Sequence, residues 1–160
     1  MKKALTIITI FALVLLAFTS CVSGGGTENQ GGGSATNGSS SNLGDYNVVI
    51  ESSRLATDYA GEPIIIVKYT FTNNDDEPAA FWTSLSCEAY QDGIGLNECL
   101  IAADSANYSS DNMYKQIKKG ATLSVEVAYE LNDETTDVEI EVSEWFSFND
   151  KKVTKTFTIR

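Results

Sequence analysis

The chain of 160 residues contains no histidine. Histidine is the usual general base of enzymes and the commonest metal ligand, so Ser-His-Asp and Cys-His catalytic arrangements are excluded. Positive charge is also scarce, because 11 Lys and Arg stand against 22 Asp and Glu, which leaves a net charge of −11. Phosphate groups repel such a chain, so we expect no nucleic-acid partner. The local basic cluster of Lys115, Lys118 and Lys119 fits a turn that faces water. The composition therefore predicts a protein that is not an enzyme and carries no cofactor.

The first of only three cysteines, Cys21, follows an apolar run that is too short to be a membrane-spanning helix of the mature chain. Lys2 and Lys3 precede this run, residues 5–18, and together they have the layout of a signal peptide over residues 1–20. The run ends in the letters LAFTSC at 16–21, which is the lipobox pattern of bacterial lipoproteins. We expect cleavage before Cys21 and acylation of its thiol and amine by fatty acids such as palmitate, since two or more acyl chains anchor a protein stably. The alternative is an ordinary signal peptide cut after Ser20.

Residues 21–42 combine the lipidated cysteine with a tether of Gly and Ser that has almost no apolar side chain to bury. A flexible coil of about 21 residues has a root-mean-square reach of roughly 25 Å, enough to hold a small domain away from the bilayer. Loss of Lys2 and Lys3 with the signal peptide changes the net charge from −11 to about −13. The predicted location is the extracellular face of the bacterial cell membrane, with residues 43–160 displayed as one folded domain.

Alternation of apolar and polar residues, the mark of half-buried strands, runs through residues 43–160. It is clearest where Ile65, Val67, Tyr69 and Phe71 fall on one face of a strand. Residues 102–120 are expected to form a long loop with at most a short helical turn near 110–116. The pattern predicts an all-β protein, an antiparallel β-sandwich. About seven strands are expected, at residues 46–51, 64–73 and 81–89, around Leu96, and at 122–131, 138–143 and 153–159.

Four segments of this domain carry a resemblance to a known family. They are YTFTNNDDEP at 69–78, AYQDG at 89–93, IKKGA at 117–121 and VAYEL at 127–131. The chain resembles a lipoprotein domain family of Gram-positive bacteria, the domain of unknown function numbered 5067, over nearly all of residues 43–160. The resemblance implies an immunoglobulin-like β-sandwich related to secreted mycobacterial immunoprotective antigens. It implies no established activity and provides no functional residues to carry over, and Cys87 and Cys99 lie outside its pattern.

Cys87 and Cys99 form an even pair in a domain expected to be exported, and an oxidising compartment favours their joining. They lie on either side of the turn former Asp92-Gly93, and a two-residue hairpin loop puts Cys87 opposite Glu98, one position short of Cys99. A bulge at one of the nearby glycines supplies the missing residue. We therefore predict a disulfide between Cys87 and Cys99, with two buried thiols as the alternative.

Clusters of acidic residues raise two further hypotheses. Asp75, Asp76 and Glu77, with the asparagines before them, offer oxygen ligands of the kind that Ca²⁺ binds, although turn chemistry explains the same residues without a metal. A second set sits at outward strand positions and forms one acidic sheet face if its strands are neighbours, which suggests a hydrolase that uses carboxylates alone or, more simply, a solvated face. This second set is Glu126, Glu130, Glu139, Glu141 and Glu144.

The aromatic residues supply the candidate binding surface. Trp145, Phe146 and Phe148 cannot all point inward from one strand, and Trp82 and Tyr90 lie opposite the face of Phe81. Exposed aromatics stack on sugars and anchor protein partners, so we take Trp82, Tyr90, Trp145 and Phe148 as a binding surface for an unknown protein or glycan. Burial at sheet edges is the alternative. The function expected is a membrane-anchored extracellular lipoprotein with a binding module. A structural accessory subunit of a cell-envelope complex is the second hypothesis, and the acidic hydrolase is the third.

Overall fold

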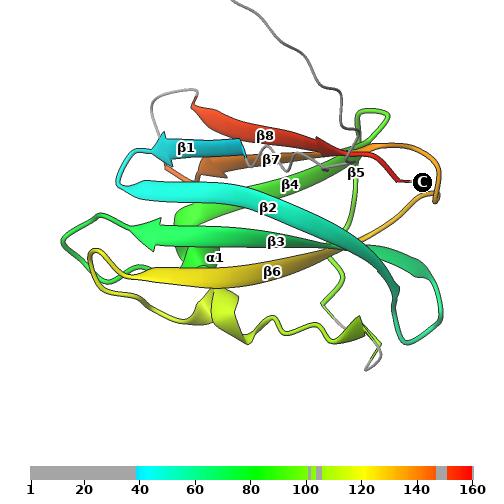
Figure 1. Cartoon of the computed structure of the whole chain (residues 1–160), viewed down its shortest axis with the longest axis horizontal. Coiled ribbons are helices and arrows are strands. Elements are labelled where there is room, and N and C mark those ends of the chain that lie inside the picture. Colours follow the sequence, from blue (N-terminus) through cyan, green and yellow to red (C-terminus); the bar gives the residue numbers. More distant parts are fainter. Residues whose placement is uncertain (1–38, 101, 104–105, 147–150, 160) are drawn as a thin grey trace, which may run out of the picture. The chain divides into compact units, whose positions relative to one another are not determined.

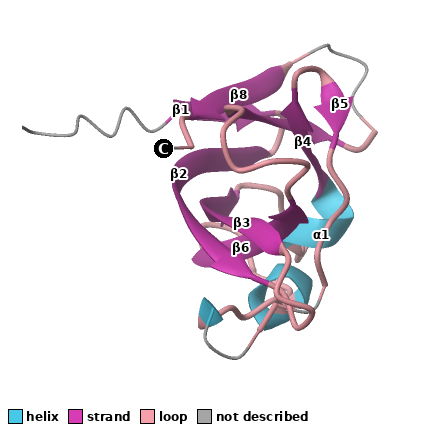
Figure 2. Ribbon diagram, turned by 90° about the vertical axis from the view of Figure 1, so that its right-hand side faces the viewer, coloured by secondary structure: helices cyan, strands magenta, loops and turns pink. Residues whose placement is uncertain are grey.

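The computed structural model of the chain describes residues 39–100, 102–103, 106–146 and 151–159. Two antiparallel sheets face each other in these residues (Figures 1 and 2). The first sheet has the order β1 (Ser39–Leu43), β2 (Tyr46–Thr57), β3 (Pro63–Asn73) and β6 (Thr122–Glu130). The second has the order β5 (Ile94–Gly95), β4 (Leu85–Gln91), β7 (Val138–Glu144) and β8 (Lys152–Phe157).

The chain crosses between the sheets in the Greek-key manner of immunoglobulin-like domains. Hairpins join neighbouring strands within each sheet, whereas the connections from β3 to β4, from β5 to β6 and from β6 to β7 pass from one sheet to the other. The all-β sandwich predicted from the sequence is confirmed. None of the helices among the described residues is long and apolar enough to cross a membrane.

The core lies between the two sheets and follows the predicted alternation. Ile65, Val67, Tyr69 and Phe71 of β3 are all buried and face the second sheet. Ile64 and Ile66, which fall on the other face of β3, are buried too. They pack with Cys99, Ala106 and Ala128 in a smaller apolar cluster, because the segment that follows Glu98 folds over the outside of the first sheet.

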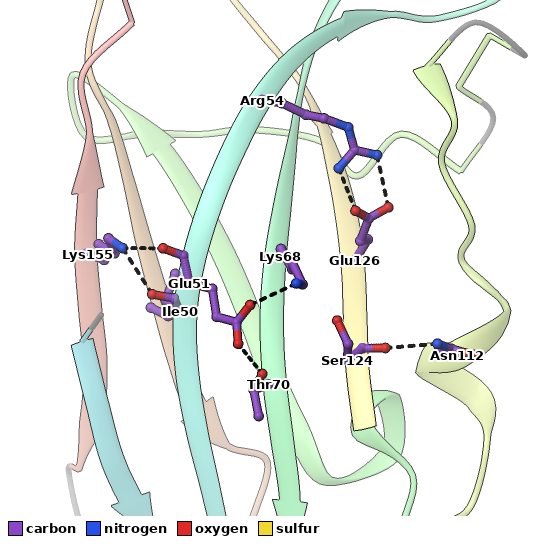
Figure 3. A network of polar contacts seen from close by, with 9 residues as sticks. All are labelled: Ile50, Glu51, Arg54, Lys68, Thr70, Asn112, Ser124, Glu126 and Lys155. Atoms are coloured by element: carbon purple, nitrogen blue, oxygen red, sulfur yellow. Dashed lines mark hydrogen bonds and ion pairs between the residues drawn. The ribbon is translucent and has the colours of Figure 1, made fainter. Parts of the chain in front are cut away.

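Arg54 binds the covering segment, the described residues of 99–108, which packs on the outside of the first sheet. Arg54 of β2 forms a two-pronged ion pair with Glu126 of β6, with distances of 2.5 and 3.0 Å between nitrogen and oxygen atoms (Figure 3). The same guanidinium donates to the carbonyl oxygens of Ala106 and Asn107 at 3.3 and 3.2 Å. One side chain thus links β2, β6 and the covering segment.

Strand β2 is longer than predicted and continues past Glu51 through a bulge between Ile50 and Ser52. The bulge leaves Glu51 without a partner residue in the register of β2 and β3. Its carboxylate accepts a hydrogen bond from Thr70 and forms an ion pair with Lys68 at 3.1 Å. Lys155 of β8 donates to the carbonyl oxygens of Ile50 and Glu51 at 3.1 and 2.6 Å, which joins the two sheets at this edge (Figure 3).

The boundaries also differ from the sequence prediction at β1 and at residues 81–84. Strand β1 begins at Ser39, within the segment expected to be tether, because its backbone pairs with β2 from Ser39 opposite Ile50 to Leu43 opposite Tyr46. The strand expected from residue 81 is wrong for its first four residues, which form the short helix α1 (Phe81–Ser84). Phe81 is buried there against the rings of Tyr69 and Phe71, at centroid distances of 5.4 and 5.7 Å.

The long loop before β6 agrees with the prediction. It contains a short 3₁₀ helix, η2 (Asp111–Tyr114), within the stretch where a helical turn was expected. Asn112 of this helix donates to the carbonyl oxygen of Ser124 at 2.9 Å, so η2 is attached to β6 (Figure 3).

Candidate functional site

A cavity of about 220 Å³ opens between β4 and β6. Strand β6 is the edge strand of its sheet. Strand β5 is only two residues long and pairs with β4 at Tyr90 and Gln91, so in the described part of the chain the first residues of β4 have no strand beside them on that side. The space between the sheets is therefore accessible from this side. The residues that matter for its chemistry are Trp82, Cys87, Glu88, Glu98, Val127 and Trp145.

One end of the cavity is closed by the segment that crosses from β5 to β6. The backbone of Leu96 donates to the carbonyl oxygen of Ala89 at 2.8 Å, which keeps the start of this segment on β4. The backbone of Cys99 then donates to Ala128 of β6 at 2.8 Å. Glu98 thereby lies directly opposite Tyr129. Opposed residues of an antiparallel pair point to the same side, so the side chain of Glu98 is directed with Tyr129 toward the interior.

The carboxyl of Glu98 is half-buried and has no hydrogen-bond or ion-pair partner among the described residues. Burial raises the pKa of this carboxyl above its ordinary value, because the charged form loses hydration without a compensating contact. The thiol of Cys87 lies nearby, and its pKa is raised well above the ordinary value by burial and then by the charges of Glu98 and Glu88.

Two buried tyrosines lie behind these groups. The hydroxyls of Tyr69 and Tyr129 share a hydrogen bond of 3.2 Å at the centre of the core. Burial raises the pKa of both phenols well above the ordinary value, and the charge of Glu98 adds to that effect. Both hydroxyls therefore remain protonated, and each satisfies the other inside the core.

The other end of the cavity carries the two tryptophans of the chain. Trp145 follows β7 and donates through its indole nitrogen to the carbonyl oxygen of Trp82 in α1, at 3.2 Å. Its backbone N–H donates to the carbonyl oxygen of Ser84 at 3.2 Å, which ties the end of β7 to α1. The ring of Trp82 also contacts Tyr114 of η2, with 6.0 Å between ring centroids. Trp82 and Trp145 remain 36% and 52% exposed, so apolar aromatic surface lines the cavity mouth.

The predicted aromatic surface is therefore brought together only in part. Trp82 and Trp145 meet, and Phe146 follows Trp145 in the chain with 89% of its surface exposed. Tyr90 lies elsewhere, on the outer face of the second sheet, where its hydroxyl donates to Glu88. That hydrogen bond to a carboxylate raises the pKa of Tyr90 to about 12. Phe148 lies outside the described residues, and so does Cys21, the predicted lipidation site.

The predicted disulfide is not supported, since Cys87 and Cys99 are not bonded to each other. The reason is the path of the chain after the hairpin. Asp92 and Gly93 both have positive φ and form a tight two-residue turn without the expected bulge. Cys87 then faces the core between the sheets, whereas Cys99 is carried to the outer face of the first sheet, against Ala128. The first sheet separates the two thiols.

The acidic residues offered as a calcium site act as turn residues. The side-chain oxygen of Asn73 accepts from the backbone of Asp75 at 2.9 Å, and that of Asp75 accepts from the backbone of Glu77 at 3.3 Å. Asp76 is paired with Lys119 at 2.5 Å. Across the described ranges, no group of three or more acidic or cysteine side chains is arranged to hold a metal ion.

The idea of a single acidic sheet face is wrong, because its strands are not neighbours. Glu126 and Glu130 belong to β6 in the first sheet, whereas Glu139, Glu141 and Glu144 belong to β7 in the second. Glu126 is paired with Arg54, and Glu141 is paired with Lys152 at 2.6 Å. The carboxylates are therefore distributed over two separate faces.

Glu98, which lines the cavity, and Tyr114, which contacts one of its lining tryptophans, were not identified as site residues from the sequence. Glu98 was noted only as the residue opposite Cys87 in an ideal hairpin, and it does face the same cavity as Cys87. Tyr114 reaches Trp82 from the long loop, and no local pattern indicates that contact.

Comparison with known proteins agrees with this fold. The sequence matches a family described as a domain of unknown function (DUF5067) over residues 27–144. A "putative lipoprotein" from Staphylococcus aureus superposes with a TM-score of 0.56 at 18% identity, over 77% of this chain and 94% of the other. A protein from Enterococcus faecalis gives 0.56 at 16% identity, over 76% and 90% of the two chains. A conserved hypothetical protein from Bacillus anthracis gives 0.51 at 16% identity, over 72% and 90%. No protein of curated function matches the chain.

Proposed function

This chain belongs to the DUF5067 domain family, and we propose that it is a lipid-anchored extracellular lipoprotein whose β-sandwich binds a partner at the cavity between Trp82 and Trp145. One observation carries the binding role. Both tryptophans of the chain lie at the mouth of one cavity, partly exposed and held together by the indole hydrogen bond. Tryptophan is enriched among residues that dominate binding, and a fixed pair of indoles binds with little loss of side-chain entropy.

The anchoring role rests on the chain's N-terminus. The lipobox ending at Cys21 predicts acylation. The Gly- and Ser-rich tether after it is long enough to hold the sandwich away from the membrane surface. One structurally similar protein is itself described as a lipoprotein, which supports the same assignment. The signal peptide, the acyl chains and the extracellular location belong to this proposal.

We further propose that the domain is not an enzyme. The chain has no histidine. Cys87, the thiol in the cavity, has a raised pKa because burial and the charge of Glu98 disfavour its thiolate. A nucleophilic cysteine needs the opposite environment, one that stabilises the thiolate. The cavity is therefore suited to holding a ligand and unsuited to attacking it.

The experiment that tests the binding role is capture of partners from the cell envelope by the full chain, after chemical crosslinking in intact cells. A Trp82→Ala and Trp145→Ala double variant is compared with an Ile94→Ala and Leu100→Ala control, since Ile94 and Leu100 are apolar, each 64% exposed, and lie outside this cavity. We expect the tryptophan variant to lose its crosslinked partner while the control retains it. Capture that does not depend on the tryptophans contradicts the proposal and agrees with a structural accessory subunit.

A further inference from the structure

We propose that the cavity between β4 and β6, which is lined by Trp82, Trp145 and Glu98, binds an alkylammonium group, a cation that carries methyl or methylene carbons. The inference rests on the proposed function and names the ligand class of the same site.

The charge of the cavity favours a cation. The carboxylate of Glu98 lines it, and no lysine or arginine is among its described lining residues. Glu88 also borders the cavity, but its carboxylate accepts from Tyr90 on the outer face of the second sheet. The carboxylate of Glu98 is half-buried and has no hydrogen-bond or ion-pair partner among the described residues. Glu126 of β6 and Glu141 of β7, in contrast, are paired with Arg54 and Lys152. A desolvated carboxylate recovers favourable electrostatic energy when a cation approaches, and the effect is larger in a partly enclosed site than in bulk water.

The apolar part of the lining decides which cation fits. Phe81, Leu85 and Val127 join the two tryptophans there. Metal cations such as Ca²⁺ need six or more oxygen ligands, which this lining does not supply. An alkylammonium group carries a weakly hydrated charge inside an apolar shell. It gains from cation–π attraction to indole faces and from burial of its carbon atoms, and it needs no oxygen cage.

The size of the cavity points to a small group. Pockets for drug-sized ligands measure about 300–1,000 Å³. At about 220 Å³ this cavity is smaller, and it suits a trimethylammonium head group with a short chain. The partly exposed indoles leave room for the rest of a larger ligand at the mouth.

The chain provides its own reporter for a test. Because its only two tryptophans line this cavity, intrinsic tryptophan fluorescence reports on the site alone. The full chain in a non-ionic detergent is titrated with choline chloride. Parallel titrations use sodium chloride and the uncharged choline analogue in which a tert-butyl group replaces trimethylammonium. We expect saturable change with choline only. No saturable change with choline, or an equal response to the uncharged analogue, overturns the proposal.

Substitutions locate the binding. Glu98→Gln keeps the shape of the side chain and removes its charge, and we expect choline to bind about fivefold or more weakly. Glu134→Gln is the matched control, because Glu134 is exposed and outside the cavity lining, so binding is expected to stay within about twofold. Trp145→Phe, which leaves one indole as the reporter, is expected to weaken binding about threefold or more.

The two proposals fail in different ways. Choline binding that survives Glu98→Gln and Trp145→Phe places the cation elsewhere and overturns this inference. If choline does not bind but envelope capture still depends on the tryptophans, the alkylammonium inference fails and the binding function stands.

Discussion

The indole nitrogen of Trp145 and the carbonyl oxygen of Trp82 lie 3.2 Å apart and form a hydrogen bond. The contact joins the end of β7 to α1, and its two residues are 63 positions apart in the sequence. It places the chain's two tryptophans at one cavity, which the half-buried Glu98 also lines. Figure 2 shows α1 beside β4. The expected effects below follow from this arrangement and from the contacts that support it.

Removing the charge of Glu98 is expected to stabilise the fold at neutral pH. Its folded-state pKa is raised by burial, so folding disfavours the charged form. Below the ordinary pKa near 4.5 the carboxyl is neutral in both states and the penalty is absent. The penalty grows as pH rises from that value to the folded-state pKa and is constant above it. Glu98→Gln should therefore raise the free energy of unfolding at pH 7 by less than about 1 kcal/mol and leave it unchanged near pH 3.

Urea denaturation of wild type and variant at the two pH values measures this difference. A destabilised variant at pH 7 would contradict the raised pKa. The expected gain in stability also separates the effect of Glu98→Gln on ligand binding from a folding defect.

Arg54 is expected to control the segment that covers the first sheet. Arg54→Ala removes the ion pair to Glu126 and two hydrogen bonds to Ala106 and Asn107. Because the pair is partly exposed, we expect a loss of about 1–2 kcal/mol in the free energy of unfolding. Hydrogen exchange should accelerate in the covering segment more than in β3.

The control is Lys119→Ala, which removes the more exposed pair with Asp76 and should cost less than about 0.5 kcal/mol. Equal losses in the two variants would show that the covering segment does not depend on Arg54.

Asn73 is expected to be the main structural residue of the acidic turn after β3. It is fully buried, its side-chain nitrogen donates to Glu77 and Ile117 at 2.8 and 2.9 Å, and its oxygen accepts from Asp75. Asn73→Ala removes the side-chain partner of the Asp75 N–H and of the Glu77 carbonyl, while the Ile117 carbonyl still accepts from the backbone of Ala79, and the change should cost about 2–4 kcal/mol. Thermal melts measure the loss, and Asn74→Ala at the exposed neighbour should change little.

The same melts test the calcium hypothesis for this turn. Since the oxygens of Asp75 and Asp76 already accept from the backbone and from Lys119, we expect equal Tm values in millimolar Ca²⁺ and in EDTA. A Tm raised by Ca²⁺ and returned to its starting value by Asp75→Asn would restore the metal site.

The two domain cysteines are expected to be thiols. Alkylation of the unfolded chain without reductant should modify both Cys87 and Cys99, as measured by mass spectrometry of their peptides. In the folded chain Cys87 should react slowly, because burial and the charge of Glu98 raise its pKa. Peptides joined by a disulfide in the unreduced sample would contradict the observed separation of the two thiols.

The sequence predicts the parts of this fold that follow from local periodicity. The alternation in β3 correctly places Tyr69 and Phe71 in the core, and the Asp92-Gly93 dipeptide correctly marks a tight turn. Phe81 shows the limit of that signal. Phe81 can be buried whether residues 81–84 form a helical turn or a strand, so alternation alone does not distinguish the two. In the structure these residues form a helix, and the ring of Phe81 packs on Tyr69 and Phe71.

The cavity depends on contacts that are distant in sequence. Trp82 and Trp145 are recognisable as aromatics left over from the core pattern, but their meeting requires the pairing of β4 with β7. Glu98 faces inward only because its segment leaves the hairpin and pairs with β6 opposite Tyr129. Burial of Ile64 likewise depends on the loop that Arg54 holds in place. Such features are set by tertiary structure, which a single sequence does not display.

Photocrosslinking from Phe146 in living cells tests the binding site most directly. A benzophenone residue replaces Phe146, which is 89% exposed beside Trp145, and a second chain carries it at Ile94, which is 64% exposed and outside the cavity lining. After illumination, mass spectrometry identifies any adduct on each chain. We expect an adduct from position 146 that is absent or much weaker from position 94. Equal adducts from both positions, or an adduct from position 94 alone, would contradict binding at the tryptophan cavity.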